Sequence, residues 1–424
     1  MRKAKQAVWC VFWAALVCIL CAGCEAGQIL DEIPRDFVLS LQDVEEAAGG
    51  QEDVLPAESA AESAAEFAEE AEAPCFLMDE VFYYGYSCLS EAEQIWYRDI
   101  ERILGEYKES ENLSEEGLAA GLDESHIDRI FQYVMGDHPE LFYVEGYSYT
   151  KYMLGEELIS IDFSGTYSID LDAALERGEE IKKAADEILA GVDKDATDYE
   201  KIKYVYETLI RQTDYSLDAP DDQNLYSVFV NHLSVCQGYA KATQYLANRL
   251  GVECTLVLGR VDTGEGHAWN LARIDGEYYY IDTTWGDVSY QVGDASSSKE
   301  VSNAPQINYD YLNVTTEELL RTHSLDGVLP MPNCCATAAN YYVMEGALFA
   351  SYDKEQLEAL FEQSSESGQE AVAVKCADEA VFAQIKNALI DEQEIFRYLN
   401  IGEGSVAYAV NEKQLSMTFW VTNE

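Results

Sequence analysis

The sequence predicts a mixed α+β fold whose central feature is a helix packed on an antiparallel sheet. Two patterns lead to this fold class. Apolar residues recur at helical spacing in some segments and alternate with polar residues in others, and turn residues such as Asp275–Gly276 join consecutive alternating segments. We expect an N-terminal α+β region before this core and a small C-terminal α+β domain after it.

Composition excludes one large class of function. The 424 residues are 48% hydrophobic and 12% aromatic, which is ample for buried cores. Against 27 Lys and Arg stand 79 Asp and Glu, so the formal net charge is −52. A surface this acidic repels phosphate backbones. We therefore expect no nucleic-acid partner.

The first residues have the layout of an export signal. Three basic residues precede an uncharged, mostly apolar run from Ala7 to Gly23, which predicts a signal peptide over residues 1–23. The run ends in Leu-Cys-Ala-Gly-Cys, which resembles the lipobox of bacterial lipoproteins and implies lipidation at Cys24. We expect a lipid-anchored protein on the extracytoplasmic face of the cell membrane. Two alternatives stay open: cleavage near Ala22, which would secrete the protein, and a retained membrane helix.

An acidic, low-complexity segment follows over residues 24–74. Residues 25–74 contain fifteen Asp or Glu and one basic residue, Arg35. The segment has almost no apolar face to bury, and its charges repel one another. We expect a tether that holds the folded part away from the membrane.

The N-terminal α+β region is predicted over residues 75–190. Helical spacing of apolar residues indicates helices at 90–107 and 125–135, the first with a capping box at Ser90. Two alternating segments then predict a hairpin that turns near Leu154–Gly155. A further helix is expected at about 171–190.

The central domain is predicted over residues 191–330. After a helix at 198–213, the spacing of apolar residues predicts another over 237–250, ended by Gly251. Cys236 therefore lies at a helix N-terminus. There the positive end of the helix dipole and the N–H groups without helical partners favour a thiolate.

A hairpin supplies two neighbours for this thiol. Strands are predicted at 252–259, 267–274 and 277–283. If Asp275–Gly276 is a two-residue turn, alternation of side chains places His267, Trp269 and Asp282 on the same face of the sheet. A Cys, a His and an Asp would then come from a helix and two strands.

The runs CQGYA, HAWN and YIDTTW resemble the core of the transglutaminase-like superfamily, which has a papain-like fold. Flanking phrases such as DHPELFYV extend the resemblance loosely to residues 75–330. It implies that Cys236 is a nucleophile, that His267 is the general acid and base, and that Asp282 orients the histidine.

The resemblance also implies an oxyanion hole made by the Cys236 backbone N–H and one side chain. Candidates for this second donor are Tyr215, Gln223 and Asn231, and the sequence does not choose among them. Trp269 and Trp285 are expected to wall the site, although ordinary sheet packing is an equally good interpretation.

The implied chemistry is attack of a thiolate on an amide and formation of a thioester acyl-enzyme. Water as the second reactant gives a cysteine peptidase or amidase, and an amine gives a transglutaminase. We expect hydrolysis of a protein or peptide amide by a monomer. The alternatives are a transglutaminase and a non-catalytic surface module that binds peptide or glycan.

We expect no metal and no cofactor. The other histidines have no metal-ligand spacing with the cysteines: His126, His138, His232 and His323. No phosphate-binding glycine loop or EF-hand loop is visible. Beyond Cys24 seven cysteines remain, so at least one thiol is unpaired within a monomer.

The C-terminal domain is predicted over residues 331–424. The run NYYVMEGALFASY indicates strands, followed by a helix at 354–363, a strand in EAVAVKC, a helix at 379–390 and a final hairpin. No catalytic grouping is visible there. We expect an accessory or substrate-positioning role.

Overall fold

The computed structural model describes residues 12–13, 77–78, 81–288, 304–369, 371–399 and 405–422. From Cys75 onwards the chain belongs to one compact unit. The signal peptide predicted at 1–23, apart from strand β1 (Phe12–Trp13), the lipidation at Cys24 and the tether at 24–74 lie outside the described residues. Within the described part, no helix is both long and apolar enough to cross a membrane.

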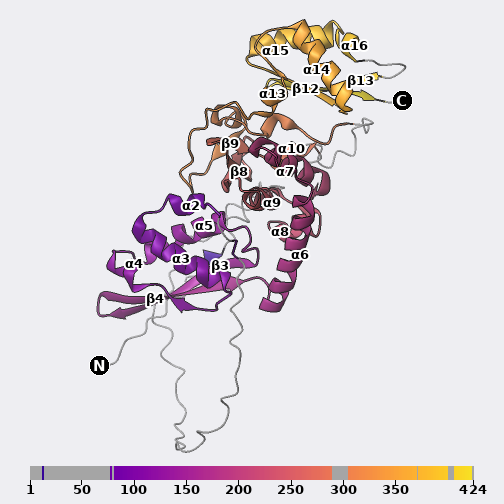
Figure 1. Cartoon of the computed structure of the whole chain (residues 1–424). Coiled ribbons are helices and arrows are strands. Elements are labelled where there is room, and N and C mark those ends of the chain that lie inside the picture. Colours follow the sequence, from indigo (N-terminus) through magenta and orange to yellow (C-terminus); the bar gives the residue numbers. More distant parts are fainter. Residues whose placement is uncertain are drawn as a thin grey trace, which may run out of the picture. The chain divides into compact units, whose positions relative to one another are not determined.

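The N-terminal region combines small helices with a long hairpin (Figure 1). The helices are α2 (Tyr84–Ser87), α3 (Glu91–Gly105), α4 (Glu115–Ala119) and α5 (Ile127–Asp137), with a 3-10 turn at Glu124–His126. Strands β2 (Glu111–Asn112), β3 (Val144–Leu154) and β4 (Glu157–Tyr167) form a sheet in the order β1-β3-β4-β2. The predicted helices and hairpin are confirmed, including the capping box at Ser90.

The central region places helices against a second antiparallel sheet. Its main helices are α6 (Leu171–Leu189), α7 (Asp198–Gln212), α8 (Leu225–Phe229) and α9 (Cys236–Arg249). Strands β7 (Cys254–Val261), β8 (Gly266–Ile274), β9 (Glu277–Ile281) and β10 (His323–Leu325) are ordered β10-β7-β8-β9. Helix α9 packs on β8 and β7, and α9 lies beside β8 in Figure 1. The predicted α+β fold with a helix on an antiparallel sheet is confirmed.

Smaller elements complete this region. They are the two-residue strands β5 (Asp214–Tyr215) and β6 (Leu233–Ser234), the helices α10 (Thr283–Gly286) and α12 (Thr316–Leu319), and a 3-10 turn at Tyr309–Tyr311. Strands β5 and β6 pair in parallel, with Tyr215 opposite Ser234. This pairing holds the chain that leads into α9.

The hairpin that carries the site has the predicted turn. Asp275 and Gly276 both have positive φ, at 51° and 89°, and Ile274 pairs with Glu277. One boundary is wrong: the strand predicted to reach Thr283 ends at Ile281. The chain leaves the sheet there because the Asp282 side chain accepts a hydrogen bond from the Trp285 backbone N–H and caps α10.

The C-terminal region is the third α+β part of the chain and has its own sheet, in the order β11-β12-β14-β13. It contains α13 (Tyr341–Met344), β11 (Leu348–Phe349), α14 (Lys354–Ser367), β12 (Ala371–Cys376), α15 (Glu379–Lys386), a π-helical turn at Asn387–Asp391, α16 (Ile395–Tyr398), β13 (Ser405–Asn411) and β14 (Ser416–Thr422). The strand predicted at the start of NYYVMEGALFASY is wrong. The Asn340 side chain accepts from the Tyr342 backbone N–H and starts a helix there.

The central and C-terminal regions share a buried carboxylate. Asp310 accepts hydrogen bonds from the Tyr342 hydroxyl, the Asn411 side-chain amide and the Ser416 hydroxyl, each at 2.8 Å. The last two donors lie at the end of β13 and the start of β14. The final hairpin is therefore docked on the central region through Asp310.

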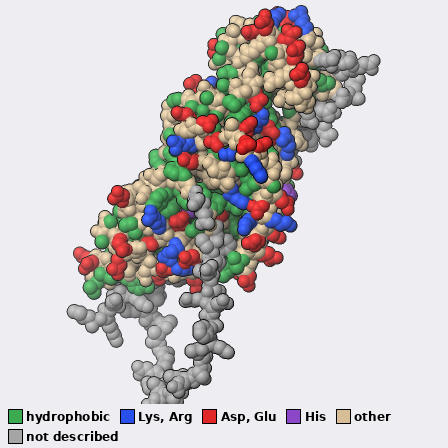
Figure 2. Space-filling view, viewed as in Figure 1, with side chains coloured by type: hydrophobic (Ala, Val, Ile, Leu, Met, Phe, Trp, Pro, Cys, Tyr) green, Lys and Arg blue, Asp and Glu red, His purple; other side chains and the backbone are tan. Residues whose placement is uncertain are grey.

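The visible surface agrees with the composition. Figure 2 shows Asp and Glu side chains spread over that face, with Lys and Arg side chains among them rather than gathered in one basic patch. Such a surface favours solubility and repels polyanions.

A buried histidine joins the N-terminal helices. His138 Nδ1 lies 2.9 Å from Glu140 Oε1, and its Nε2 lies 3.2 Å from Glu101 Oε1. Burial alone would lower the pKa of His138, but Glu140 and Glu101 outweigh it and raise this pKa to about 10. Nearby, the Gln244 amide of α9 donates to the Gly136 carbonyl at 2.8 Å. This region therefore helps to hold α9.

The raised pKa makes stability depend on pH. Because the folded pKa of His138 lies above its ordinary value of 6.5, its proton stabilises the fold fully below that value, and this contribution is lost as the pH rises towards 10. We expect the free energy of unfolding to fall by up to roughly 1.4 kcal/mol per pH unit in this window. In His138→Gln this part of the fall should be absent.

Urea unfolding across this pH window checks the expectation. His126→Gln is the matched control, because His126 lies in a more exposed turn before α5. An equal pH dependence in His138→Gln and the wild type would contradict it.

Candidate active site

Cys236 is the first residue of α9. Its side chain is 2% exposed and belongs to an apolar cluster with Ala240, Leu256 and Ala268. No acidic residue lies in the first turn of α9, so the positive end of the helix dipole is not offset there. Gly238 is required in the same turn, because a Cβ would lie 1.9 Å from Ser234 Oγ.

Two hydrogen bonds fix α9 to the elements that carry the other two predicted residues. The Asn270 side chain of β8 donates to the Ala240 carbonyl of α9 at 2.9 Å. The hydroxyls of Thr243 in α9 and Thr283 in α10 are 2.8 Å apart. Asn270 lies three residues after His267, and Thr283 directly follows Asp282. The start of α9 is thereby held in register with both.

His267 and Asp282 lie together, as the alternation of side chains along the hairpin predicts. His267 Nε2 lies 2.7 Å from Asp282 Oδ2, and both side chains are buried. The other carboxylate oxygen, Oδ1, accepts the Trp285 backbone N–H at 3.0 Å. Ala268, which follows His267, lies in the same apolar cluster as Cys236.

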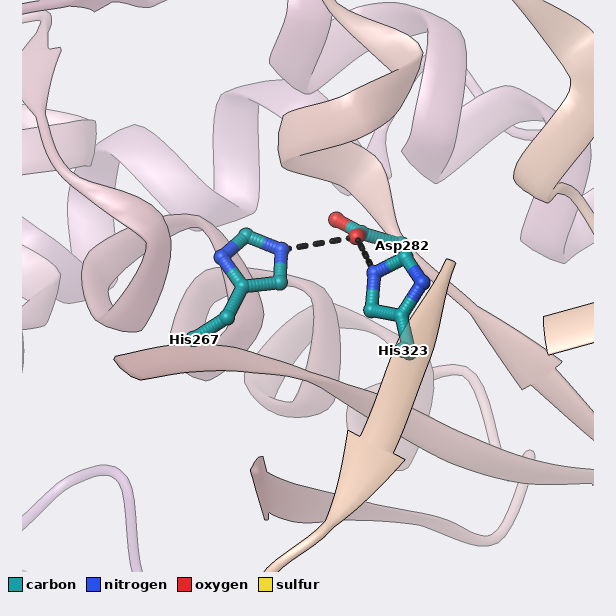
Figure 3. A group of neighbouring side chains, drawn as sticks. All are labelled: His267, Asp282 and His323. Carbon is teal, nitrogen blue, oxygen red and sulfur yellow. Dashed lines mark hydrogen bonds and ion pairs between the residues drawn. The ribbon is translucent and has the colours of Figure 1, made fainter. Parts of the chain in front are cut away.

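A second histidine, which sequence reasoning set aside, completes this group. His323 Nε2 lies 3.0 Å from the same Asp282 Oδ2. Figure 3 shows the two imidazoles approaching one carboxylate oxygen from different strands, His267 from β8 and His323 from β10. The sequence signal was weak, because β10 has three residues and lies far from the three motifs.

The charge of Asp282 decides where the protons lie. Burial alone would raise the pKa of Asp282, but His267 and His323 outweigh it and hold this pKa below its ordinary value. The carboxylate is therefore ionised at neutral pH and can only accept hydrogen bonds. Nε2 of His267 must carry the proton, which makes Nδ1 the basic nitrogen of the neutral ring.

Two tryptophans flank the imidazoles. The ring centroids of Trp269 and Trp285 lie 5.8 Å and 6.1 Å from that of His267. Trp269 is fully buried, whereas Trp285 is partly exposed. Trp269 thus packs beneath the histidine, and Trp285 is the ring that lies nearer to solvent.

The predicted oxyanion candidates lie in the chain that leads to α9. Gln223 follows Asp222, whose carbonyl accepts the Val235 N–H at 3.1 Å. Tyr215 of β5 pairs with Ser234 of β6, and Ser234 lies two residues before Cys236, the first residue of α9. Asn231 donates its side-chain amide to the Pro220 carbonyl at 3.4 Å.

Two histidines and an aspartate are residue types that bind metal ions. One ligand atom from each of His267, Asp282 and His323 lies within 4.8 Å of the others. Ligands of a tetrahedral zinc at about 2.0–2.1 Å would stand about 3.3 Å apart. The nitrogen-to-oxygen distances of 2.7 Å and 3.0 Å are shorter and are those of hydrogen bonds.

Four of the other described cysteines have a raised pKa. All six described cysteines are free thiols. Burial raises the pKa of Cys254, raises that of Cys376 to about 12 and raises that of Cys334 to about 11. Burial also raises the pKa of Cys88. These four thiols are therefore protonated and weakly nucleophilic at neutral pH.

One known family matches the part of the chain that carries Cys236, His267 and Asp282. Residues 182–283 match the family model of the transglutaminase-like superfamily. This segment is a transglutaminase-like domain. It contains Cys236, His267 and Asp282, whereas His323 follows the matched range.

Similarity to individual curated proteins is low and covers only part of the chain. Kyphoscoliosis peptidase of Homo sapiens is 24% identical over 122 residues, which are 25% of this chain and 18% of that protein. The Mus musculus protein is 22% identical over 123 residues, or 25% and 19%. The match thus spans less than a fifth of the length of these relatives.

Solved structures are similar to parts of the chain. One crystal structure of a TGase has a TM-score of 0.24 and 16% identity, over 38% of this chain and 48% of that one. The periplasmic domain of TgpA from Pseudomonas aeruginosa, bound to ethylmercury, has a TM-score of 0.19 and 16% identity, over 31% and 57%.

The geometry predicts the tautomer of His267. In a Cys236→Ala variant, which removes the thiol as a proton source, we expect neutral His267 to carry its proton on Nε2, because that atom faces the ionised Asp282. Nitrogen-15 spectra of the imidazole rings measure this. In Asp282→Leu the preference should disappear, and a proton on Nδ1 in the Cys236→Ala protein would contradict the assignment.

Proposed function

We propose that the protein is a cysteine hydrolase that acts on a protein or peptide amide through Cys236, His267 and Asp282. The observation that supports it most is the His267–Asp282 bond at 2.7 Å, on a sheet tied by Asn270 to the helix that begins with Cys236. The order helix dipole, thiol, imidazole and carboxylate is the one that nucleophilic thiol catalysis needs.

The first half-reaction forms the acyl-enzyme. The Cys236 thiol gives its proton to His267 Nδ1, and the thiolate attacks the amide carbonyl carbon. The imidazolium, stabilised by ionised Asp282, then returns the proton to the leaving nitrogen as the C–N bond breaks. The products of this step are a free amine and a thioester at Cys236.

The second half-reaction releases the acid. His267 Nδ1 takes a proton from water, whose oxygen attacks the thioester carbonyl. The C–S bond breaks, the acid product leaves, and the proton returns to the Cys236 sulfur. An amine in place of water gives an amide instead, which is the transglutaminase alternative.

For the oxyanion we favour the Cys236 backbone N–H with the Gln223 side chain. Each of these residues adjoins one partner of the 3.1 Å hydrogen bond from Val235 N–H to the Asp222 carbonyl. That bond keeps the two chain segments close.

We also propose that the protein is exported and anchored by a lipid at Cys24. The basic and apolar layout of residues 1–23 and the lipobox-like ending support it. The acidic segment at 24–74 would then act as a self-repelling spacer from an anionic membrane. The substrate would be a protein or peptide in the cell envelope.

Selective alkylation tests the nucleophile. With iodoacetamide near neutral pH, we expect Cys236 to react faster than exposed Cys88, because an imidazole and a helix N-terminus favour its thiolate. His267→Ala should slow Cys236 by about 10²-fold or more. Mass spectrometry of the labelled peptides measures both rates.

Cys254→Ala is the matched control, because it removes a buried thiol outside the site. It should leave the Cys236 rate unchanged. If Cys236 reacts no faster than Cys88, the non-catalytic binding module becomes the better explanation.

A glutamine peptide with a labelled amine distinguishes water from amine as the second reactant. We expect ammonia or cleavage products without incorporation of the amine, because the proposal makes water the acceptor. Cys236→Ala supplies the background. Incorporation of label faster than release of acid would instead identify a transglutaminase.

A further inference from the structure

The Asp282 carboxylate has one more donor than a Cys–His–Asp triad uses. Its Oδ2 faces His267 Nε2 at 2.7 Å and His323 Nε2 at 3.0 Å. An ionised carboxylate only accepts, so His323 also holds its proton on Nε2. Two imidazoles therefore share one buried negative charge.

His323 is held firmly in this position. Its Nδ1 lies 2.8 Å from Thr322 Oγ1, and the Tyr311 hydroxyl lies 3.2 Å from the same oxygen. With the proton on Nε2, Thr322 donates to Nδ1 and Tyr311 donates to Thr322. This one-way chain of donors ends at Asp282.

The backbone around His323 is equally constrained. His323 pairs with Val261 of β7, and Ser324 with Arg260. Gly259 allows β10 to approach, because a Cβ there would lie 2.1 Å from the Ser324 carbonyl oxygen and 2.4 Å from the Trp269 ring. A side chain at residue 259 would displace either β10 or Trp269, and His323 with them.

We propose that His323 is a positioning residue of this site: its imidazole is the second N–H donor that fixes the Asp282 carboxylate opposite His267. This inference rests on the proposed function, because it assigns His323 a role in the reaction of Cys236. In this role His323 acts through Asp282, because its Nε2 lies 3.0 Å from Asp282 Oδ2.

Sharing the carboxylate changes the acid and base strength of His267. A donor on Oδ2 withdraws part of the negative charge that stabilises protonated His267. His267 then gives up its proton to a leaving amine more readily than it would beside an unshared carboxylate. The shared carboxylate thus stabilises the His267 imidazolium less and makes transfer of its proton easier.

The groups near His323 that could also change the acid strength of His267 are few among the described residues. Among described residues with a hydrogen bond or ring contact to His323, those that titrate are Asp282, His267 and Tyr311. Burial raises the pKa of Tyr311, so its hydroxyl stays neutral at the pH of the test. Trp269 and Trp285 fill the other ring contacts.

The test follows Cys236 alkylation by iodoacetamide against pH in His323 variants of the full chain. The upper inflection of this profile reports loss of the His267 proton. In His323→Phe we expect it to move up by about half to one pH unit, because Asp282 then serves His267 alone. His323→Gln, whose amide can donate as Nε2 does, should restore the wild-type inflection.

Matched controls separate this role from a structural one. His126→Phe should not move the inflection, and thermal unfolding of each variant shows whether it is folded. An unchanged inflection in folded His323→Phe, or equal shifts in the Phe and Gln variants, overturns the proposal. His323→Leu replaces the Phe variant if that protein does not fold.

The proposed function and this inference fail differently. Slow alkylation of wild-type Cys236 would overturn the proposed function, and the pKa of His267 would then be followed by nitrogen-15 spectra in the same variants. A His323 ring without a proton on Nε2 in the wild-type spectrum overturns the inference even if Cys236 is reactive.

Discussion

An ionised carboxylate without contact with water governs the arrangement of the central region. Asp282 is completely buried, and removing such a charge from water costs several kcal/mol unless donors surround it. The donors are His267 on β8, His323 on β10 and the Trp285 backbone in α10. Strand order β10-β7-β8-β9 and the short helix after β9 are what bring these three groups to one place.

The two elements that carry His267 and Asp282 are also hydrogen-bonded to α9. Asn270 and Thr283 each lie within three residues of a member of the histidine–aspartate pair, and both bond to α9. In the proposed site the electrostatic order runs from the positive end of α9 through the Cys236 thiol and the His267 imidazole to the buried Asp282 carboxylate. Each member lowers the cost of ionising its neighbour.

The sequence was most informative where local geometry leaves no freedom. A two-residue turn at Asp275–Gly276 fixes the register of its hairpin, so His267 and Asp282 could be paired by counting. His323 could not be found this way, because it lies in a three-residue strand without a periodic pattern. The aromatic run at Tyr341–Met344 misled for a related reason: its cap at Asn340 favours a helix over the apparent strand pattern. Cleavage and lipidation at Cys24 stay predictions from sequence alone.

The donors around Asp310 bear on modularity. The carboxylate belongs to the central region, yet Asn411 and Ser416 come from the last hairpin of the chain. A cut near residue 331, the predicted start of the C-terminal domain, would remove two hydrogen-bond donors from this buried acid. The central region therefore depends on the C-terminal region for hydrogen bonds to Asp310. Any replacement for it would have to present hydrogen-bond donors at the same point to remain compatible with the rest of the molecule.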